Sequence, residues 1–145
     1  MNILVLEDRG EVSFYLREFL ESEGHVVLEA YNPNDAQSHW NVRKKVSVDC
    51  IIADLNMPPD GLTDEETASS RNGLLSGWYW LSGRVFPECP EMRKRVIVYS
   101  DYLADFKRYV RSEEYAGIRL VAKRGSSSPA EAILNHLREI AWLAR

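Results

Sequence analysis

The chain has 145 residues, of which 45% are hydrophobic and 28% charged, and its formal net charge is −4 at pH 7. This length fits one compact domain, residues 1–145, which can bury enough apolar surface to fold without disulfides or a structural metal. The net negative charge argues against a protein that binds the phosphate backbone of nucleic acids, so we expect no direct nucleic-acid binding.

In the first half of the chain, short apolar runs alternate with amphipathic stretches, which predicts an α/β fold with a parallel sheet. The run Asn2–Leu6 is continuously apolar after its first residue, as expected for a strand covered on both faces. Apolar residues between 12 and 20 have helical spacing, and Gly24 is placed to end that helix in a left-handed conformation. A second strand is predicted over residues 25–30 and a second helix over about 35–45.

The same alternation continues through the second half. A buried strand over residues 48–53 precedes an acidic stretch at about 59–73, rich in Pro, Gly, Ser and Thr, which predicts an extended exposed loop. An aromatic-rich helix follows at 74–81; its Trp78 and Trp80 belong either to the core or to an anchor for a partner. Further elements are expected as strand 96–99, helix 103–114 and strand 118–122.

The last helix has the clearest signals in the chain. Ser128, Pro129 and Glu131 supply an N-cap, a first-turn proline and the acidic residue of a capping box. One apolar stripe follows, formed by Ile133, Leu134, Leu137, Ile140, Ala141 and Ala144. Five strands alternating with five helices predict a three-layer sandwich.

Cysteine usage and hydropathy indicate the compartment. Cys50 and Cys89 do not make a disulfide framework, and Cys50 is predicted to be a small buried thiol. The chain shows neither a secretory leader nor an apolar run long enough to span a bilayer, so we expect a cytoplasmic protein without membrane contact.

Polar residues follow the apolar runs at the points where the predicted strands end. In an open parallel sheet, ligands bind outside the carboxyl ends of the strands, near the point where the strand order reverses. The residues at these ends are Glu7, Asp8, Asp54, Asn56, Ser100 and Lys123. We therefore expect three carboxylates, a hydroxyl and an ammonium group to converge on one edge of the sheet.

Such a cluster favours phosphoryl chemistry. Carboxylates held together repel one another, and Mg²⁺ suits them because it takes oxygen ligands and leaves room for phosphate oxygens. An aspartate such as Asp54 can itself be the nucleophile and form an aspartyl phosphate. Lys123 would then hold the phosphoryl oxygens, and Ser100 would donate a hydrogen bond to one of them.

Each residue also has a structural interpretation. Asp8 and Glu11 have the spacing of a capping box, so Glu7 and Asp8 could simply begin the first helix. Asp54, followed by a proline-containing loop, could be a turn residue. Their joint placement at four strand ends is what favours the functional interpretation.

In this order the residues resemble the receiver domain of bacterial response regulators. The matching segments are residues 3–8 (ILVLED), 49–58 (DCIIADLNMP), 96–100 (VIVYS) and 120–123 (LVAK). The resemblance covers nearly the whole chain and implies a flavodoxin-like fold with strand order 2-1-3-4-5, as in the stand-alone chemotaxis regulators.

The resemblance also implies roles for individual residues. Asp54 corresponds to the phosphoacceptor, Ser100 to the switch hydroxyl and Lys123 to the phosphate-binding lysine. The Mg²⁺ ligands would be Glu7, Asp8, Asp54 and the backbone carbonyl of Asn56. The usual phosphodonor is a histidine kinase or phosphotransfer protein.

Four features depart from the family pattern. Arg124 stands where proline with a cis peptide is usual, and a non-proline cis bond costs about 2.5–4 kcal/mol, so we predict a trans bond and a somewhat displaced Lys123. Leu120 replaces the aromatic residue that rotates on activation. Asp101 replaces a small residue and adds a negative charge that should disfavour phosphorylation unless it points away. The acidic loop at 59–73 is longer than usual.

Three functions remain open from the sequence alone. The first is a phosphorylation-dependent switch that signals by contact with an unknown downstream protein or by phosphoryl relay. A homodimer is compatible with this function. The second is a degenerate receiver that binds a partner without phosphorylation, as the departures at Asp101, Leu120 and Arg124 suggest. The third, a phosphohydrolase of the haloacid-dehalogenase type, is disfavoured because Asn56 replaces its second aspartate; we expect no turnover enzyme.

Overall fold

A five-stranded parallel sheet forms the centre of the computed structural model, which describes residues 1–124 and 128–143. The strands are β1 (Asn2–Leu6), β2 (Val26–Ala30), β3 (Cys50–Ala53), β4 (Val96–Ser100) and β5 (Arg119–Ala122). Their order is β2-β1-β3-β4-β5, and every neighbouring pair is parallel. The predicted flavodoxin-like strand order is confirmed, with strand ends shifted by one or two residues.

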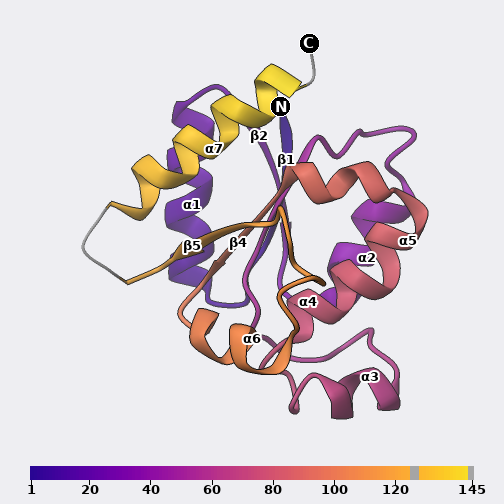
Figure 1. Ribbon diagram of the computed structural model, residues 1–145. Coiled ribbons are helices and arrows are strands. Elements are labelled where there is room, and N and C mark those ends of the chain that lie inside the picture. Colours follow the sequence, from indigo (N-terminus) through magenta and orange to yellow (C-terminus); the bar gives the residue numbers. More distant parts are fainter. Residues whose placement is uncertain (125–127, 144–145) are drawn as a thin grey trace.

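Helices cover both faces of the sheet and make the predicted three layers (Figure 1). One face carries α1 (Gly10–Ser22) and α7 (Pro129–Leu143), and the other carries α2 (Pro33–Asn41), α4 (Ser76–Trp80) and α5 (Phe86–Glu88). The remaining helices are α3 (Asp64–Ser69), which lies at the periphery, and α6 (Leu103–Tyr109). None of the helices in the described ranges is long and apolar enough to cross a membrane.

The described residues form seven α-helices rather than the five predicted. One addition is α3, which lies inside the predicted loop. The other arises because the predicted helix 74–81 continues through a π-helical turn, Leu81–Val85, into α5. A 3₁₀-helix, Pro90–Arg95, then leads into β4.

Two apolar clusters, one on each face, explain why the strands are continuously apolar. Alternate strand residues face opposite sides of the sheet. Leu4, Leu6, Ile51 and Ala53 pack under α2 and α4, whereas Ile3, Val5, Cys50 and Ile52 pack under α1 and α7. Cys50 is a buried free thiol, as predicted, and burial raises its pKa to about 12.

Several helix ends follow from local signals. The helix α1 ends before Gly24, which has a φ of 87°, as predicted. Asn32 caps α2 by accepting a hydrogen bond from the Asp35 backbone N–H at 2.8 Å, so α2 begins earlier than predicted. The helix α6 ends at Tyr109, not at residue 114, because Val110 takes an extended conformation and its side chain is buried in the core.

The prediction for α7 is confirmed where the structure describes it. The Glu131 backbone N–H donates to Ser128 Oγ at 3.4 Å, and Pro129 is the first helical residue. Ile133, Leu137 and Ile140 are buried against the sheet. Ala144, the last residue of the predicted stripe, lies outside the described residues.

The acidic segment 59–73 is exposed as predicted at Asp60, Asp64 and Glu65, but it is not simply a loop. Thr63 and Glu66 form a reciprocal capping box that begins α3. Glu66 also accepts two hydrogen bonds from the Arg84 guanidinium, at 2.6 and 2.7 Å. This bidentate pair fixes α3 to the π-helical turn.

Trp78 and Trp80 both belong to the hydrophobic core, the first of the two interpretations considered for them. Trp80 is 1% exposed, and its indole N–H donates to Gln37 Oε1 at 3.0 Å. Trp78 packs edge-on against Phe86 and Phe106, with ring centroids 5.9 and 5.0 Å apart. The aromatic residues thus join α4 to α2, α5 and α6.

Candidate functional site

Three carboxylates meet at the carboxyl edge of the sheet. Glu7 and Asp8 follow β1, and Asp54 follows β3, which pairs with β1 in register. One carboxylate oxygen from each of the three lies within 4.8 Å of the other two. Glu7 and Asp54 are buried, whereas Asp8 is exposed. The predicted convergence of these side chains is therefore present.

Lys123 joins the two buried carboxylates from the end of β5. Its Nζ donates to Glu7 Oε2 at 2.5 Å and to Asp54 Oδ2 at 2.8 Å. The second oxygens are also engaged: Glu7 Oε1 accepts from the Arg9 backbone N–H at 3.0 Å, and Asp54 Oδ1 from the Leu55 N–H at 2.7 Å. These contacts hold the Asp54 carboxylate in a fixed orientation.

The charges at this edge are strongly coupled. Burial, together with the nearby Asp54 carboxylate, raises the pKa of Glu7 from its usual 4.5 to about 7, against the opposing effect of Lys123. Burial alone would lower the pKa of Lys123, but the Asp54 and Glu7 carboxylates outweigh it and the pKa is raised. One buried ammonium group thus only partly compensates two buried carboxylates, which leaves room for a further cation.

The helix-capping interpretation of Asp8 is wrong. The N-cap residue of α1 is Arg9, and no side chain caps this helix end. Asp8 instead lines the cavity at the sheet edge. The start of α1 therefore does not explain Asp8, although Glu7 Oε1 accepts from the backbone N–H of the N-cap residue Arg9.

The donor set fits a hard divalent cation. Mg²⁺ prefers oxygen ligands and keeps several waters, so a few carboxylates at an open edge suffice. Glu7, Asp8 and Asp54 supply such oxygens, and Asn56 lines the same cavity. The hydrogen bonds to Glu7 and Asp54 do not exhaust their carboxylate oxygens, because each oxygen can accept more than one.

The cavity at the sheet edge, which Asp8 and Asn56 line, measures about 320 Å³. It is lined by Asp8, Arg9, Asp54, Asn56, Asp101, Tyr102, Lys123 and Arg124. Ser100 ends β4 at the same edge, but it is fully buried, does not line the cavity, and accepts a hydrogen bond from the Tyr102 N–H at 3.0 Å. Arg9 and Tyr102 were not predicted, although Arg9 directly follows Asp8 and Tyr102 lies two residues after Ser100.

Two of the sequence departures meet at this cavity. The described peptide bonds include none that is cis, so the Lys123–Arg124 bond is trans, as predicted. Lys123 still contacts Asp54 directly. Arg124 forms an ion pair with Asp101, with 3.6 Å between Arg124 Nε and Asp101 Oδ1.

The start of α4 packs directly on the backbone around Asp54. The Gly77 N–H donates to the Leu55 carbonyl at 3.0 Å, and Ser76 Oγ donates to the Met57 carbonyl at 3.0 Å. A Cβ atom at Gly77 would lie 1.9 Å from the Asp54 carbonyl oxygen, so only glycine fits. The sequence signal for this contact is a glycine within an otherwise bulky helix.

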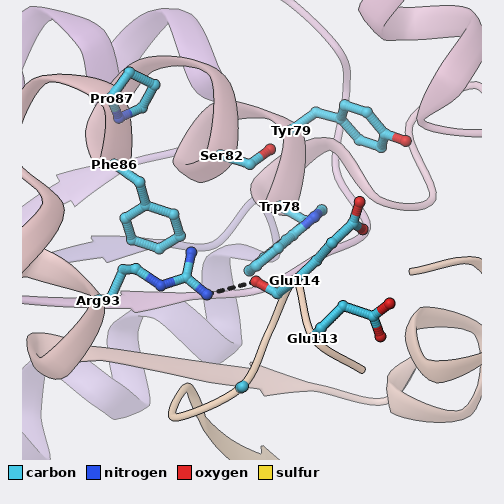
Figure 2. A pocket seen from close by; sticks show the side chains of 9 residues that line it. Trp78, Tyr79, Ser82, Phe86, Pro87, Arg93, Glu113 and Glu114 are labelled. Atoms are coloured by element: carbon cyan, nitrogen blue, oxygen red, sulfur yellow. Dashed lines mark hydrogen bonds between the residues drawn. The ribbon is translucent and has the colours of Figure 1, made fainter. Parts of the chain in front are cut away.

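A second, larger hollow lies between α4, α5 and the turns after α6. It measures about 700 Å³, and Trp78, Phe86 and Arg93 form much of its wall (Figure 2). The Arg93 guanidinium stacks on Phe86 at 4.8 Å and donates to the Glu114 carbonyl. None of its lining residues lines the sheet-edge cavity. It opens where α6 ends earlier than predicted.

Comparisons with known proteins point to one fold. No family model matches the chain. Response regulator GtcR of Aneurinibacillus migulanus is 38% identical over 56 residues, which are 39% of this chain and 22% of that protein. The chain thus matches less than a quarter of that relative's length.

Solved structures match over almost the whole chain. A Francisella response-regulator receiver domain has a TM-score of 0.68 at 15% identity, covering 99% of this chain and 98% of that one. The HemR receiver domain from Leptospira biflexa has a TM-score of 0.66 at 18% identity, covering 96% and 92%. TrrA from Thermotoga maritima, in complex with Mg²⁺-BeF, has a TM-score of 0.66 at 17% identity, covering 96% and 97%. At these identities the likeness is one of fold.

Proposed function

We propose that this chain, which has the fold of response-regulator receiver domains, is a phosphorylation-dependent switch of a two-component pathway with Asp54 as its phosphoacceptor. The observation that carries the proposal is the double contact of Lys123 Nζ with Asp54 and Glu7, at 2.8 and 2.5 Å, where three carboxylates meet. This arrangement places a cation beside the carboxylate that would receive the phosphoryl group.

In the proposed reaction, a carboxylate oxygen of Asp54 attacks the phosphorus of the donor. The bond from phosphorus to the histidine nitrogen of a kinase or phosphotransfer protein breaks, and the nitrogen keeps the electron pair and takes up a proton. Phosphoryl transfer depends mainly on positioning and charge neutralisation. Lys123 neutralises charge on the transferred oxygens, and the Leu55 N–H helps to orient the acceptor.

Glu7, Asp8, Asp54 and the backbone carbonyl of Asn56 would hold Mg²⁺, which when bound neutralises charge on the phosphoryl oxygens. Ser100 would donate its hydroxyl to one of these oxygens. Because Ser100 is fully buried and does not line the cavity, this contact requires the segment after β4 to move. Such a movement would change the surface after β4 when Asp54 is phosphorylated, and a partner could recognise that change.

Residues 1–145 would act as a single receiver unit, and its output would be a protein contact or a phosphoryl relay. The phosphodonor would be a cytoplasmic histidine kinase or phosphotransfer protein. The chain would assist its own phosphorylation and dephosphorylation without turning over small molecules.

A second candidate is a receiver that binds its partner without phosphorylation. The observation in its favour is the placement of Ser100 outside the cavity, combined with Leu120 at the position where the family has a mobile aromatic residue. In that case the Lys123 contacts would serve only to neutralise buried charge.

Incubation with acetyl phosphate and Mg²⁺, followed by intact-protein mass, separates the two candidates. The proposal expects the wild type to gain one phosphoryl group, and Asp54→Asn and a magnesium-free reaction to gain none. No gain by a folded wild type would place the phosphorylation-independent module first.

A further inference from the structure

Asp101 and Arg124 are electrostatic partners at the mouth of the sheet-edge cavity. Asp101 follows β4 and Arg124 follows Lys123 after β5, and these two strands are parallel neighbours. The Arg124 Nε lies 3.6 Å from Asp101 Oδ1, and both residues line the cavity together with Asp54. The pair therefore lies within the proposed phosphoacceptor site.

The two partners differ in their freedom to move. The Arg124 side chain is 84% exposed, whereas the Asp101 side chain is 23% exposed. An exposed ion pair with a single contact contributes little to stability, and a long arginine side chain has many rotamers. Arg124 is consequently the partner that can leave at small cost.

The charge of the cavity favours such a departure once Asp54 carries a phosphoryl group. The cavity is lined by three aspartates and three cations. Phosphorylation adds up to about two negative charges and three acceptor oxygens next to Lys123. A guanidinium group binds phosphate oxygens through two parallel hydrogen bonds, which are stronger than one long contact with a carboxylate.

We propose that Arg124 exchanges Asp101 for the phosphoryl group on Asp54, and is thus a second phosphoryl-binding cation beside Lys123. The inference rests on the proposed function of Asp54. Asp101 competes with the phosphoryl group for Arg124 and also repels it. The pair thereby sets how tightly the phosphorylated state is held.

Beryllofluoride with Mg²⁺ mimics a phosphoryl group on a carboxylate, and its affinity can be measured by titration calorimetry. Arg124→Ala should weaken binding about fivefold to tenfold, and Arg124→Lys less, because lysine keeps the charge without the paired donors. Asp101→Asn should tighten binding about threefold by removing the competitor. Arg138→Ala removes an exposed arginine of α7 and serves as the control, with unchanged affinity.

The double variant decides whether Arg124 contacts the phosphoryl group. The exchange predicts that Arg124→Ala weakens binding in the Asp101→Asn background as well. Loss of its effect in that background would show that Arg124 only screens Asp101, and would overturn the inference. Equal affinity of all variants would overturn it too. A folded wild type that binds no beryllofluoride would instead refute the proposed function, and the inference with it.

Discussion

The sheet edge and the segment 58–88 hold Asp54 from two sides by different physics. At the sheet edge, Lys123 holds the Asp54 side chain through charge and bridges it to the buried carboxylate of Glu7. In segment 58–88, the start of α4 holds the Asp54 backbone through close packing at Gly77. The charge environment of Asp54, the proposed acceptor, is therefore set separately from its backbone position, and substitutions should distinguish the two.

The largest effect on stability is expected where Gly77 packs against the backbone of Asp54. Gly77→Ala places a Cβ atom 1.9 Å from the Asp54 carbonyl oxygen, a clash that only a backbone shift can relieve. We expect a loss of about 3 kcal/mol or more in the free energy of unfolding, measured by urea denaturation. Gly10→Ala is the matched control, because a methyl group added at Gly10 would meet no atom within 4 Å. A Gly77→Ala protein as stable as Gly10→Ala would refute the packing account.

The second-largest effect is expected from removing the positive charge of Lys123 at the sheet edge. Lys123→Met leaves Glu7 and Asp54 buried without their cation, and we expect a loss of about 2–3 kcal/mol at pH 8. The loss should shrink at pH 5.5, since Glu7, whose pKa is already raised to about 7, is then protonated. Lys107→Met, at an exposed position of α6, should change stability little. A loss that is the same at both pH values would argue against charge as the cause.

The raised pKa of Glu7 predicts that the proposed binding of magnesium depends on pH. A raised carboxyl pKa favours the protonated folded state, so stability without metal falls as pH rises from 4.5 to about 7. Magnesium needs the ionised carboxylate, and at ten times its Kd it should add about 1.4 kcal/mol at pH 8. Thermal unfolding should show little gain at pH 5.5. A stabilisation by magnesium that does not increase with pH would show that Glu7 is not a metal ligand.

The smallest effect concerns the attachment of α3. Glu66→Gln breaks the bidentate pair with Arg84 and should cost about 0.5–1 kcal/mol at pH 7. Hydrogen bonding to Arg84 lowers the pKa of Glu66, so this contribution is present above pH 4.5 and is lost as pH falls through the folded-state pKa. The affinity for beryllofluoride should stay at the wild-type value; a change would show that α3 influences the proposed acceptor site at Asp54.

Much of the sheet edge could be predicted from sequence because parallel strands bring their carboxyl ends together. Once the ends of three strands were located in the sequence, the convergence of Glu7, Asp54 and Lys123 could be predicted. The pairing of Asp101 with Arg124 could not be predicted, because it depends on side-chain directions across two strands. Both residues were expected as separate departures and meet as one ion pair.

The segment 58–88 was predicted less well, for local reasons. The capping box of Thr63 and Glu66 was present in the sequence, but the surrounding Pro, Gly and Ser favoured a loop. The glycine at position 77 stands out in an otherwise bulky helix, but the backbone that it meets at Asp54 is decided by tertiary packing, which the local sequence does not specify. The end of α6 at Tyr109 likewise reflects burial of Val110, a tertiary effect that overrides helical spacing.

The role proposed for Asp54 is tested most simply by locating the phosphoryl group after reaction with acetyl phosphate and Mg²⁺. Borohydride reduction of the acyl phosphate followed by peptide mass mapping marks the modified residue. We expect modification at Asp54 alone in the wild type, and none in Asp54→Asn. Modification at another carboxylate, or none in a folded wild type, would contradict it.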